Sequence, residues 1–98
     1  MTAQAPLISG SSVVKLARGV KLREDPVRGH VVLLAPERAM ALDEIAVRIV
    51  RALDGERTLA RIAADFAAEF EAPVAEIAND IEAFVRELSI RRMLEFVE

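Results

Sequence analysis

The order of apolar and polar positions along the chain predicts a small β-structure followed by helices. Apolar and basic residues alternate over residues 20–23, which is the two-residue period of a half-buried strand. Residues 30–34 are short, aliphatic and partly β-branched, which predicts a second strand, and the five residues 25–29 have the Pro and Gly chemistry of a hairpin loop. After a turn at Pro36, residues 39–42 offer a third short strand.

The remainder of the chain has helical periodicity. Asp43 and Thr58 are good N-cap residues and Pro73 suits a first helical turn, so three helices are expected to follow these positions. Asp54–Gly55 is expected to end the first helix, with Gly55 in the left-handed position. The apolar stripes predict the buried faces as Ile45, Ala46, Ile49, Val50 and Leu53, then Leu59, Ile62, Ala63, Phe66, Ala67 and Phe70, then Val74, Ile77, Ile81, Phe84, Val85 and Leu88.

Three short strands before three helices predict an α+β fold. The outline is that of a winged helix-turn-helix, in which a three-stranded antiparallel sheet is followed by a three-helix bundle. Residues 1–17 are weakly patterned and contain a Ser-Gly-Ser-Ser run, so they are expected to be a flexible N-terminal segment before a folded domain over residues 18–98. Residues 94–97 fit either a terminal strand or a docking tail.

The composition argues against several classes of chemistry. There is no cysteine, which removes thiolate catalysis, disulfides and cysteine-ligated metals. His30 is the only histidine, and the carboxylates fall on polar helix faces, where such groups are usually solvated. We therefore expect no enzyme activity, no metal and no cofactor. Without a signal-peptide pattern or an apolar run long enough to span a bilayer, the sequence predicts a cytoplasmic protein with no membrane partner.

A DNA-binding winged-helix regulator is the main alternative allowed by the topology. The net charge is −3, and between residues 71 and 90 five carboxylates accompany the single base Arg86. A recognition helix with this charge would repel the phosphates from which nucleic-acid affinity mainly comes. We therefore expect no nucleic-acid partner.

Peptide capture by strand addition fits the sequence better. The first strand carries Lys21 and Arg23, and charged side chains protect a sheet edge from pairing. The third strand has neither Lys nor Pro between Ala39 and Leu42, so an extended peptide could bond along it. From spacing alone, coverage of this edge by the chain's own terminus, or by a second copy in a homodimer, is an equal alternative.

Several segments resemble the PqqD family, the peptide chaperones of pyrroloquinoline quinone (PQQ) biosynthesis. The resemblance rests on Arg18–Arg23, Arg28–Arg38, Leu42–Glu44 and Leu53–Thr58 with Ile62, and it covers about residues 17–94. It implies a winged-helix-like recognition element for ribosomally made, modified peptides. It also implies a carrier that binds the precursor peptide PqqA and presents it to PqqE, a radical S-adenosylmethionine (SAM) enzyme.

The resemblance also implies where the peptide would bind. In related elements the peptide adds beside the third strand and packs on the third helix, which on this chain gives the peptide-binding residues Ala39, Met40, Ala41, Leu42, Val74, Ile77, Ala78 and Ile81. One departure is the absence of a Gly that the family often has near the position of Met93. The conformation of the last six residues therefore stays open.

Overall fold

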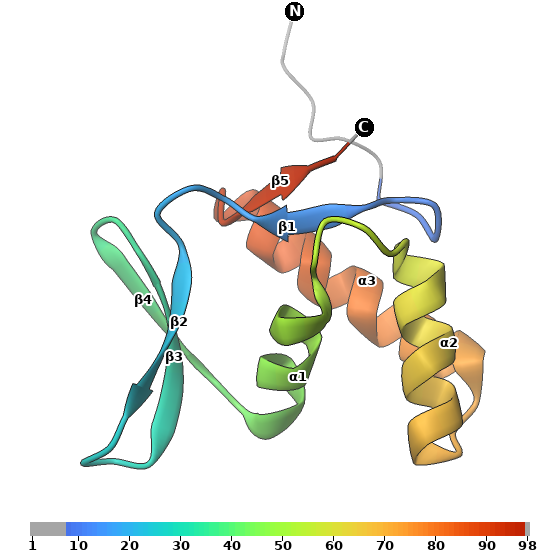
Figure 1. The fold of residues 1–98 in the computed structure, drawn as a ribbon, viewed down its shortest axis with the longest axis horizontal. Helices are drawn as coiled ribbons and strands as arrows, with labels where there is room; N and C mark the ends of the chain where they lie inside the picture. The colour runs from blue at the N-terminus through green and yellow to red at the C-terminus, as the bar shows by residue number, and fades with distance from the viewer. Residues whose placement is uncertain (1–7, 98) are drawn as a thin grey trace, which may run out of the picture.

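The structure is a computed structural model that describes residues 8–97. Its strands and helices follow one another as β1 (Val14–Leu16), β2 (Lys21–Asp25), β3 (His30–Ala35), β4 (Arg38–Leu42), α1 (Glu44–Ala52), α2 (Leu59–Phe70), α3 (Val74–Ile90) and β5 (Leu94–Phe96). The strands β2, β3 and β4 form an antiparallel meander that extends to one side of the helices (Figure 1). This arrangement confirms the predicted fold class, an antiparallel three-stranded sheet followed by three helices.

The hairpin β2–β3 is close to its prediction, but its loop is one residue shorter. Asp25 pairs with His30 and belongs to β2, so residues 26–29 form the loop. The Asp25 carboxylate accepts hydrogen bonds from the backbone N–H groups of Val27 and Arg28, at 3.0 and 3.3 Å. The side chain therefore organises the turn while its backbone continues the strand.

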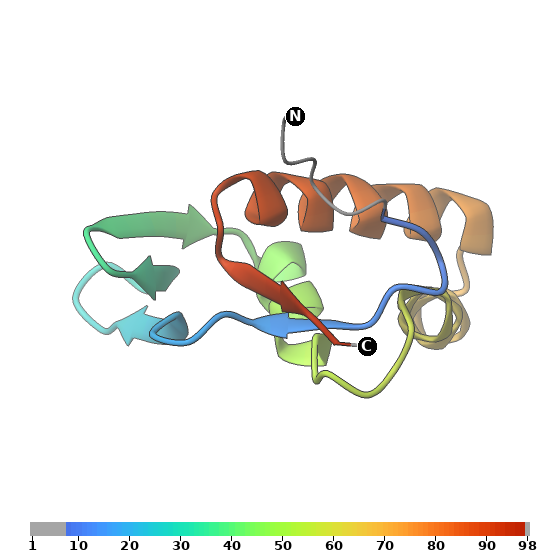
Figure 2. The same cartoon turned by 90° about the horizontal axis from the view of Figure 1, so that it is seen from above.

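A second sheet was not predicted as such. The strand β1 pairs with β5, with Val14 opposite Phe96 and Leu16 opposite Leu94, and the two lie side by side across the helices (Figure 2). Val14 is only 1% exposed. The expectation of a flexible segment is therefore wrong for β1, while residues 1–7 lie outside the described part of the chain.

The two predicted side-chain caps are confirmed. Asp43 accepts a hydrogen bond from the N–H of Ala46 at 2.7 Å, and Thr58 accepts one from Arg61 at 3.1 Å. The first helix ends earlier than expected, because Leu53 is already its C-cap. Gly55 does have a positive φ of 76°, but its N–H donates to the carbonyl of Val14, so its role is to admit β1 rather than to close the helix.

The segment before β1 supplies partners for the start of α2. The N–H groups of Leu59 and Ala60 donate to the carbonyls of Ser12 and Gly10, both at 2.9 Å. These are first-turn amides that no residue within the helix can satisfy. Residues 10–12 thus complete the N-terminus of α2, which explains why they are part of the fold.

The end of α3 has the hydrogen bonds of a Schellman motif. The N–H of Met93 donates to Leu88 and that of Arg92 to Ser89, and Arg92 adopts a left-handed φ of 60°. Arg92 therefore takes the conformation that a glycine would adopt more easily. The chain then turns back so that Met93 is buried at 1% exposure and Leu94–Phe96 forms β5.

The core lies where β1, β3 and the three helices meet. Its fully buried side chains include Leu33 on β3 and Ile62 on α2, together with Ile81, Val85 and Leu88 on α3. The predicted stripes are wrong at three positions near helix ends, because Ile45, Phe70 and Val74 are 57%, 40% and 52% exposed. Phe66, Ile77 and Phe84 are half-buried at the margin of the core.

Candidate functional site

The strand β4 is an open edge of the meander in the described part of the chain. The sheet order is β2-β3-β4, so β4 has a strand on one side only. Its closing pair with β3 is Ala35–Arg38, across the two-residue turn Pro36–Glu37. If this pair were a non-hydrogen-bonded one, the next bond of the ladder would need an N–H from Pro36, which has none. Ala35–Arg38 must therefore be a hydrogen-bonded pair. Hydrogen-bonded pairs alternate along an antiparallel ladder, so the backbone N–H and C=O groups of Ala39 and Ala41 point to the open edge.

The side chains of β4 divide between the two faces of the sheet. Met40 lies opposite Leu33 and is half-buried against the core, and Leu42 is 9% exposed. Ala39 and Ala41 are exposed on the other face. A strand added to β4 would therefore meet Met40 on the inner face, while Leu42 is already largely covered by the protein itself.

The four predicted residues on α3 differ in accessibility. Ile81 is 1% exposed and belongs to the core, Ile77 and Ala78 are half-buried, and Val74 is largely exposed. Ile77 and Ile81 line a hollow of about 300 Å³ between the three helices. Val74 and Ala78 do not line it, and neither do the four residues of β4, so the predicted residues are not all brought to one cavity.

Sequence reasoning missed the side chains that complete this hollow. Besides Ile77 and Ile81 it is lined by Ile45, Arg48, Ile49, Phe66, Phe70 and Asp80. Ile45 and Phe70 had been assigned to the core because they fit the helical stripes. Their position in the first turn of α1 and the last turn of α2 is the signal that they would escape burial. Exposed large apolar groups around one hollow are typical of a binding surface.

Arg48 contributes a cation to the rim of the hollow. Its guanidinium carbon lies 4.9 Å from the centre of the Phe70 ring, and it pairs with the Glu69 carboxylate. The centroids of the Phe66 and Phe70 rings are 5.8 Å apart, and the two ring planes are inclined by 43°. The hollow thus combines an apolar floor with a rim that carries the Arg48 cation over an aromatic face and the Asp80 carboxylate, and it suits an apolar side chain better than a charged one.

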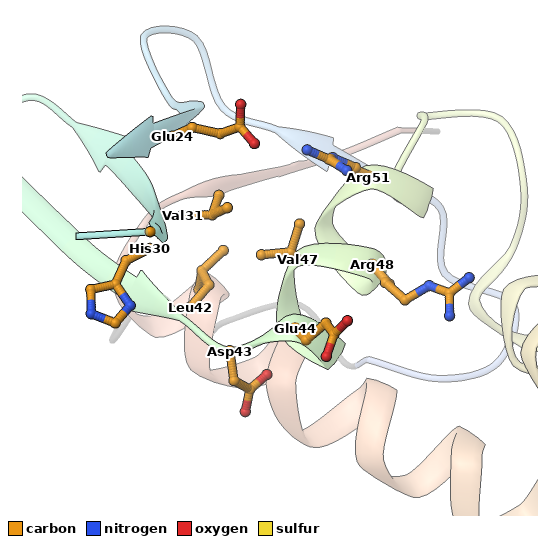
Figure 3. Close-up of a pocket in the computed structure, with 10 residues that line it drawn as sticks. Glu24, His30, Val31, Leu42, Asp43, Glu44, Val47, Arg48 and Arg51 are labelled. Carbon is orange, nitrogen blue, oxygen red and sulfur yellow. The ribbon is translucent and has the colours of Figure 1, made fainter. Parts of the chain in front are cut away.

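A second hollow, of about 600 Å³, separates the meander from α1 (Figure 3). Leu42, Val31 and Val47 line its floor, and Glu24, Asp43, Glu44, Arg48 and Arg51 give it charges of both signs. The ring of His30 points away from Val47 in this view. Within residues 8–97 no group of three or more His, Cys, Asp or Glu side chains is placed to hold a metal ion.

The most perturbed carboxylate serves the structure. The backbone N–H groups of Arg57 and Glu56, together with the Arg57 guanidinium, lower the pKa of Asp54 from 3.8 to about 2. Arg57 also pairs with Asp65 at 3.0 Å, which lowers the pKa of that carboxyl as well. These contacts stabilise the loop between α1 and α2, so the segment Leu53–Thr58 has a structural role.

Fold and site together define a small binding domain, in which a β-meander with an open strand edge stands beside a helical bundle with an apolar hollow. Residues 30–94 match the family model described as Coenzyme PQQ synthesis protein D (PqqD). The chain belongs to the PqqD family. None of the helices in the described residues is long and apolar enough to cross a membrane.

The relatives agree with this assignment. The chain is 76% identical, over the full length of both proteins, to the PqqA binding protein of Rhizobium meliloti. It is 43% identical to the bifunctional coenzyme PQQ synthesis protein C/D of Methylorubrum extorquens, over 96% of this chain and 25% of that protein.

Two solved structures are similar. The solution structure of the PqqD truncation of Methylobacterium extorquens PqqCD, described as a functional and stand-alone recognition element for ribosomally synthesized and post-translationally modified peptides, superposes with a TM-score of 0.79. It is 43% identical and is matched over 91% of this chain and 95% of its own. The crystal structure of PqqD from Xanthomonas campestris gives a TM-score of 0.58, with 42% identity and coverage of 91% and 99%.

Proposed function

We propose that this chain is a non-catalytic peptide chaperone that binds the precursor peptide PqqA and presents it to the radical SAM enzyme PqqE. The observation that carries the proposal is the open edge of β4, where four backbone groups of Ala39 and Ala41 have no partner within the meander. The Rhizobium meliloti relative, 76% identical, is named for binding PqqA.

The proposed binding mode is strand addition. An extended segment of PqqA would bond to the N–H and C=O groups of Ala39 and Ala41 and continue the meander as a fourth strand. Its inward side chains would face Met40, and beyond Leu42 the peptide would reach Ile45 and the apolar hollow with Ile77 and Ile81. This assigns a bulky apolar residue of the peptide to the hollow.

The energetics suit a carrier that must release its cargo. Up to four edge hydrogen bonds contribute roughly 1 kcal/mol each, and one or two buried apolar side chains contribute roughly 1.5–3 kcal/mol each. The cost of ordering a flexible peptide offsets part of this gain. The net affinity is therefore expected to be no tighter than about the micromolar range, which permits transfer to an enzyme.

The charge of α3 supports a peptide over DNA. Its exposed or half-exposed carboxylates are Glu76, Asp80, Glu82 and Glu87, against the single base Arg86. The carboxylates of this helix would repel approaching phosphates, and its single base would displace few of the counterions condensed on them. An uncharged peptide backbone has no such cost.

An amide-shift titration tests the proposal. The ¹⁵N-labelled protein is titrated with synthetic PqqA, and the amides of β4 and of the N-terminal half of α3 are expected to shift together and saturate together. A scrambled peptide of the same composition is the control. Shifts confined to the β2–β3 hairpin loop, or none at all, would show that β4 is not the binding edge.

A further inference from the structure

The meander has a second face that the peptide site does not use. Its register places two rows that cross all three strands on the side away from the core, with the Asp25–His30 pair beyond them at the hairpin end. One row is Lys21–Leu34–Ala39 and the other is Arg23–Val32–Ala41. We call the six residues of these two rows the outer face. Its two half-buried apolar members, Val32 and Leu34, neither belong to the core nor pack against it.

The outer face is an apolar platform with one basic margin, which lies on β2. Val32 and Leu34 are half-buried although they do not touch the core, and each lies directly opposite a long basic residue of β2. The aliphatic stems of Lys21 and Arg23 can cover part of these side chains while their charges stay in water. On the other side, Ala39 and Ala41 are exposed and add no bulk. A hollow of about 300 Å³ lies at the hairpin end of this face, lined by Arg23, Glu24, Asp25, Pro26, Val32 and Leu34.

The cations of the outer face have no carboxylate partner on it. No ion pair of the described residues involves Lys21 or Arg23. The neighbouring Glu24 lies in the row of Val31 on the inner face, and the Asp25 carboxylate is bonded to the backbone of its own turn. Residues 18–38 hold five cations and three carboxylates, whereas the rest of the chain holds eight cations and thirteen carboxylates. The meander is therefore the basic pole of an acidic protein.

We propose that the outer face is the docking surface for a protein partner that presents carboxylates around protruding apolar side chains, and that this partner is the enzyme that modifies the bound peptide. The identity of the partner rests on the function proposed above. The apolar stripe of Val32 and Leu34 takes the partner's apolar groups, and Lys21 and Arg23 take its carboxylates. Charge complementarity of this kind steers association and fixes the orientation of the two proteins.

The geometry explains why this face suits a modifying enzyme. A peptide strand added to β4 continues the sheet, and successive side chains of a strand point to opposite faces. Every second peptide side chain would therefore emerge on the outer face, beside Ala39 and Ala41. A partner seated on the platform meets these side chains directly, without displacing the peptide from the edge.

The double charge reversal K21E/R23E tests the proposal, with R86E as the matched control because Arg86 is an exposed base on α3. Binding of each full-length variant to purified PqqE is measured by calorimetry at low and at physiological salt. We expect K21E/R23E to bind at least about tenfold more weakly, R86E to bind as the unchanged protein does, and the unchanged protein to bind more weakly as salt rises. Amide spectra establish that each variant is folded, and K21Q/R23Q replaces the reversal if it is not.

PqqA titrations of the same variants separate this proposal from the peptide proposal. K21E/R23E is expected to bind PqqA as the unchanged protein does. If K21E/R23E binds PqqE normally, if R86E is equally impaired, or if the unchanged chain does not bind PqqE at all, the outer face is not the docking surface. Failure of the unchanged protein to bind PqqA would overturn the peptide proposal instead. The PqqE titrations of the variants would still test whether the outer face is the docking surface.

Discussion

Arg38 donates a hydrogen bond from its guanidinium Nη1 to the backbone carbonyl oxygen of Arg91, at 3.0 Å. The bond joins the first residue of β4 to the C-cap of α3. That carbonyl lies at the negative end of the α3 dipole, which favours a cationic partner. The open edge is thereby tied to the helix that flanks it.

Loss of this hydrogen bond should weaken peptide binding more than it lowers the stability of the fold. In R38M the aliphatic stem stays and the donor is lost, so we expect the free energy of unfolding to fall by no more than about 1 kcal/mol. The affinity for PqqA should fall severalfold, because part of the binding energy would be needed to order β4 against α3. Denaturant unfolding and calorimetry measure the two effects. R28M, at the tip of the β2–β3 loop, is the control, and an unchanged affinity in R38M would contradict the assigned role.

The direction of the Ala41 amide can be tested with proline. In A41P the N–H at the open edge is removed and no bond within the meander is lost, so peptide affinity should fall while the fold persists. M40P removes an N–H that bonds to β3 and should unfold the meander. Amide spectra and PqqA titration distinguish these outcomes. A loss of the fold in A41P as complete as in M40P would mean that the amide directions are reversed.

The burial of Val14 predicts that β1 is part of the stable fold. V14A should lower the free energy of unfolding by about 2 kcal/mol, as expected for a truncated core side chain that leaves a small cavity. V27A is the matched control, because Val27 is 92% exposed, and should leave stability unchanged. Urea unfolding followed by circular dichroism measures both. Equal midpoints for the two variants would place β1 outside the cooperative unit.

The left-handed conformation of Glu71 predicts a stabilising substitution. Glu71 is the C-cap of α2 with a φ of 52°, which costs an L-residue roughly 1–2 kcal/mol relative to glycine. Its negative charge also lies at the unfavourable end of the helix dipole. We expect E71G to raise the unfolding midpoint. The same replacement in the middle of α3, E82G, should lower it, since glycine is disfavoured in a helix interior by up to about 1 kcal/mol. A lower midpoint in E71G would contradict the assigned strain.

The lowered pKa of Asp54 predicts a loss of stability in acid. The carboxyl has a pKa of about 2 in the folded protein and an ordinary value near 3.8 in the unfolded chain. Its contribution to the free energy of unfolding is therefore complete above about pH 4. It is lost as the pH falls towards 2, because in that range the unfolded chain binds a proton more readily than the native state does. Asp65 acts in the same direction. Urea midpoints between about pH 5 and pH 2 should fall less steeply in D54N than in the unchanged protein, and parallel curves would refute the linkage.

Most of the features that the sequence predicts correctly depend on contacts between residues that are close together in the chain. Capping by Asp43 and Thr58 depends on neighbours three residues away, and the β2–β3 hairpin closes across a short loop, so both can be read from short segments. The pairing of Val14 with Phe96 depends on residues from opposite ends of the chain, and no local pattern encodes it.

The candidate site was harder to predict for a related reason. Periodicity assigns a face to each helix but does not say where the neighbouring element ends. Ile45 and Phe70 fit their stripes, yet they extend past the packed region and line the apolar hollow. The open edge of β4 could be anticipated because the absence of Lys and Pro between Ala39 and Leu42 is visible in sequence. The segregation of Lys21 and Arg23 on one face with Val32 and Leu34 needed the register of the sheet.

The pairing of β1 with β5 also orders events during synthesis on the ribosome. The meander and α1 contain their own nearest partners and can form as soon as they emerge, because their contacts are close in sequence. Val14 leaves the ribosome early but has no strand to pair with until Leu94–Phe96 has followed. Closure of the two-stranded sheet therefore has to wait for β5, and until then the edge of β1 that pairs with β5 stays open to chaperones or to neighbouring chains.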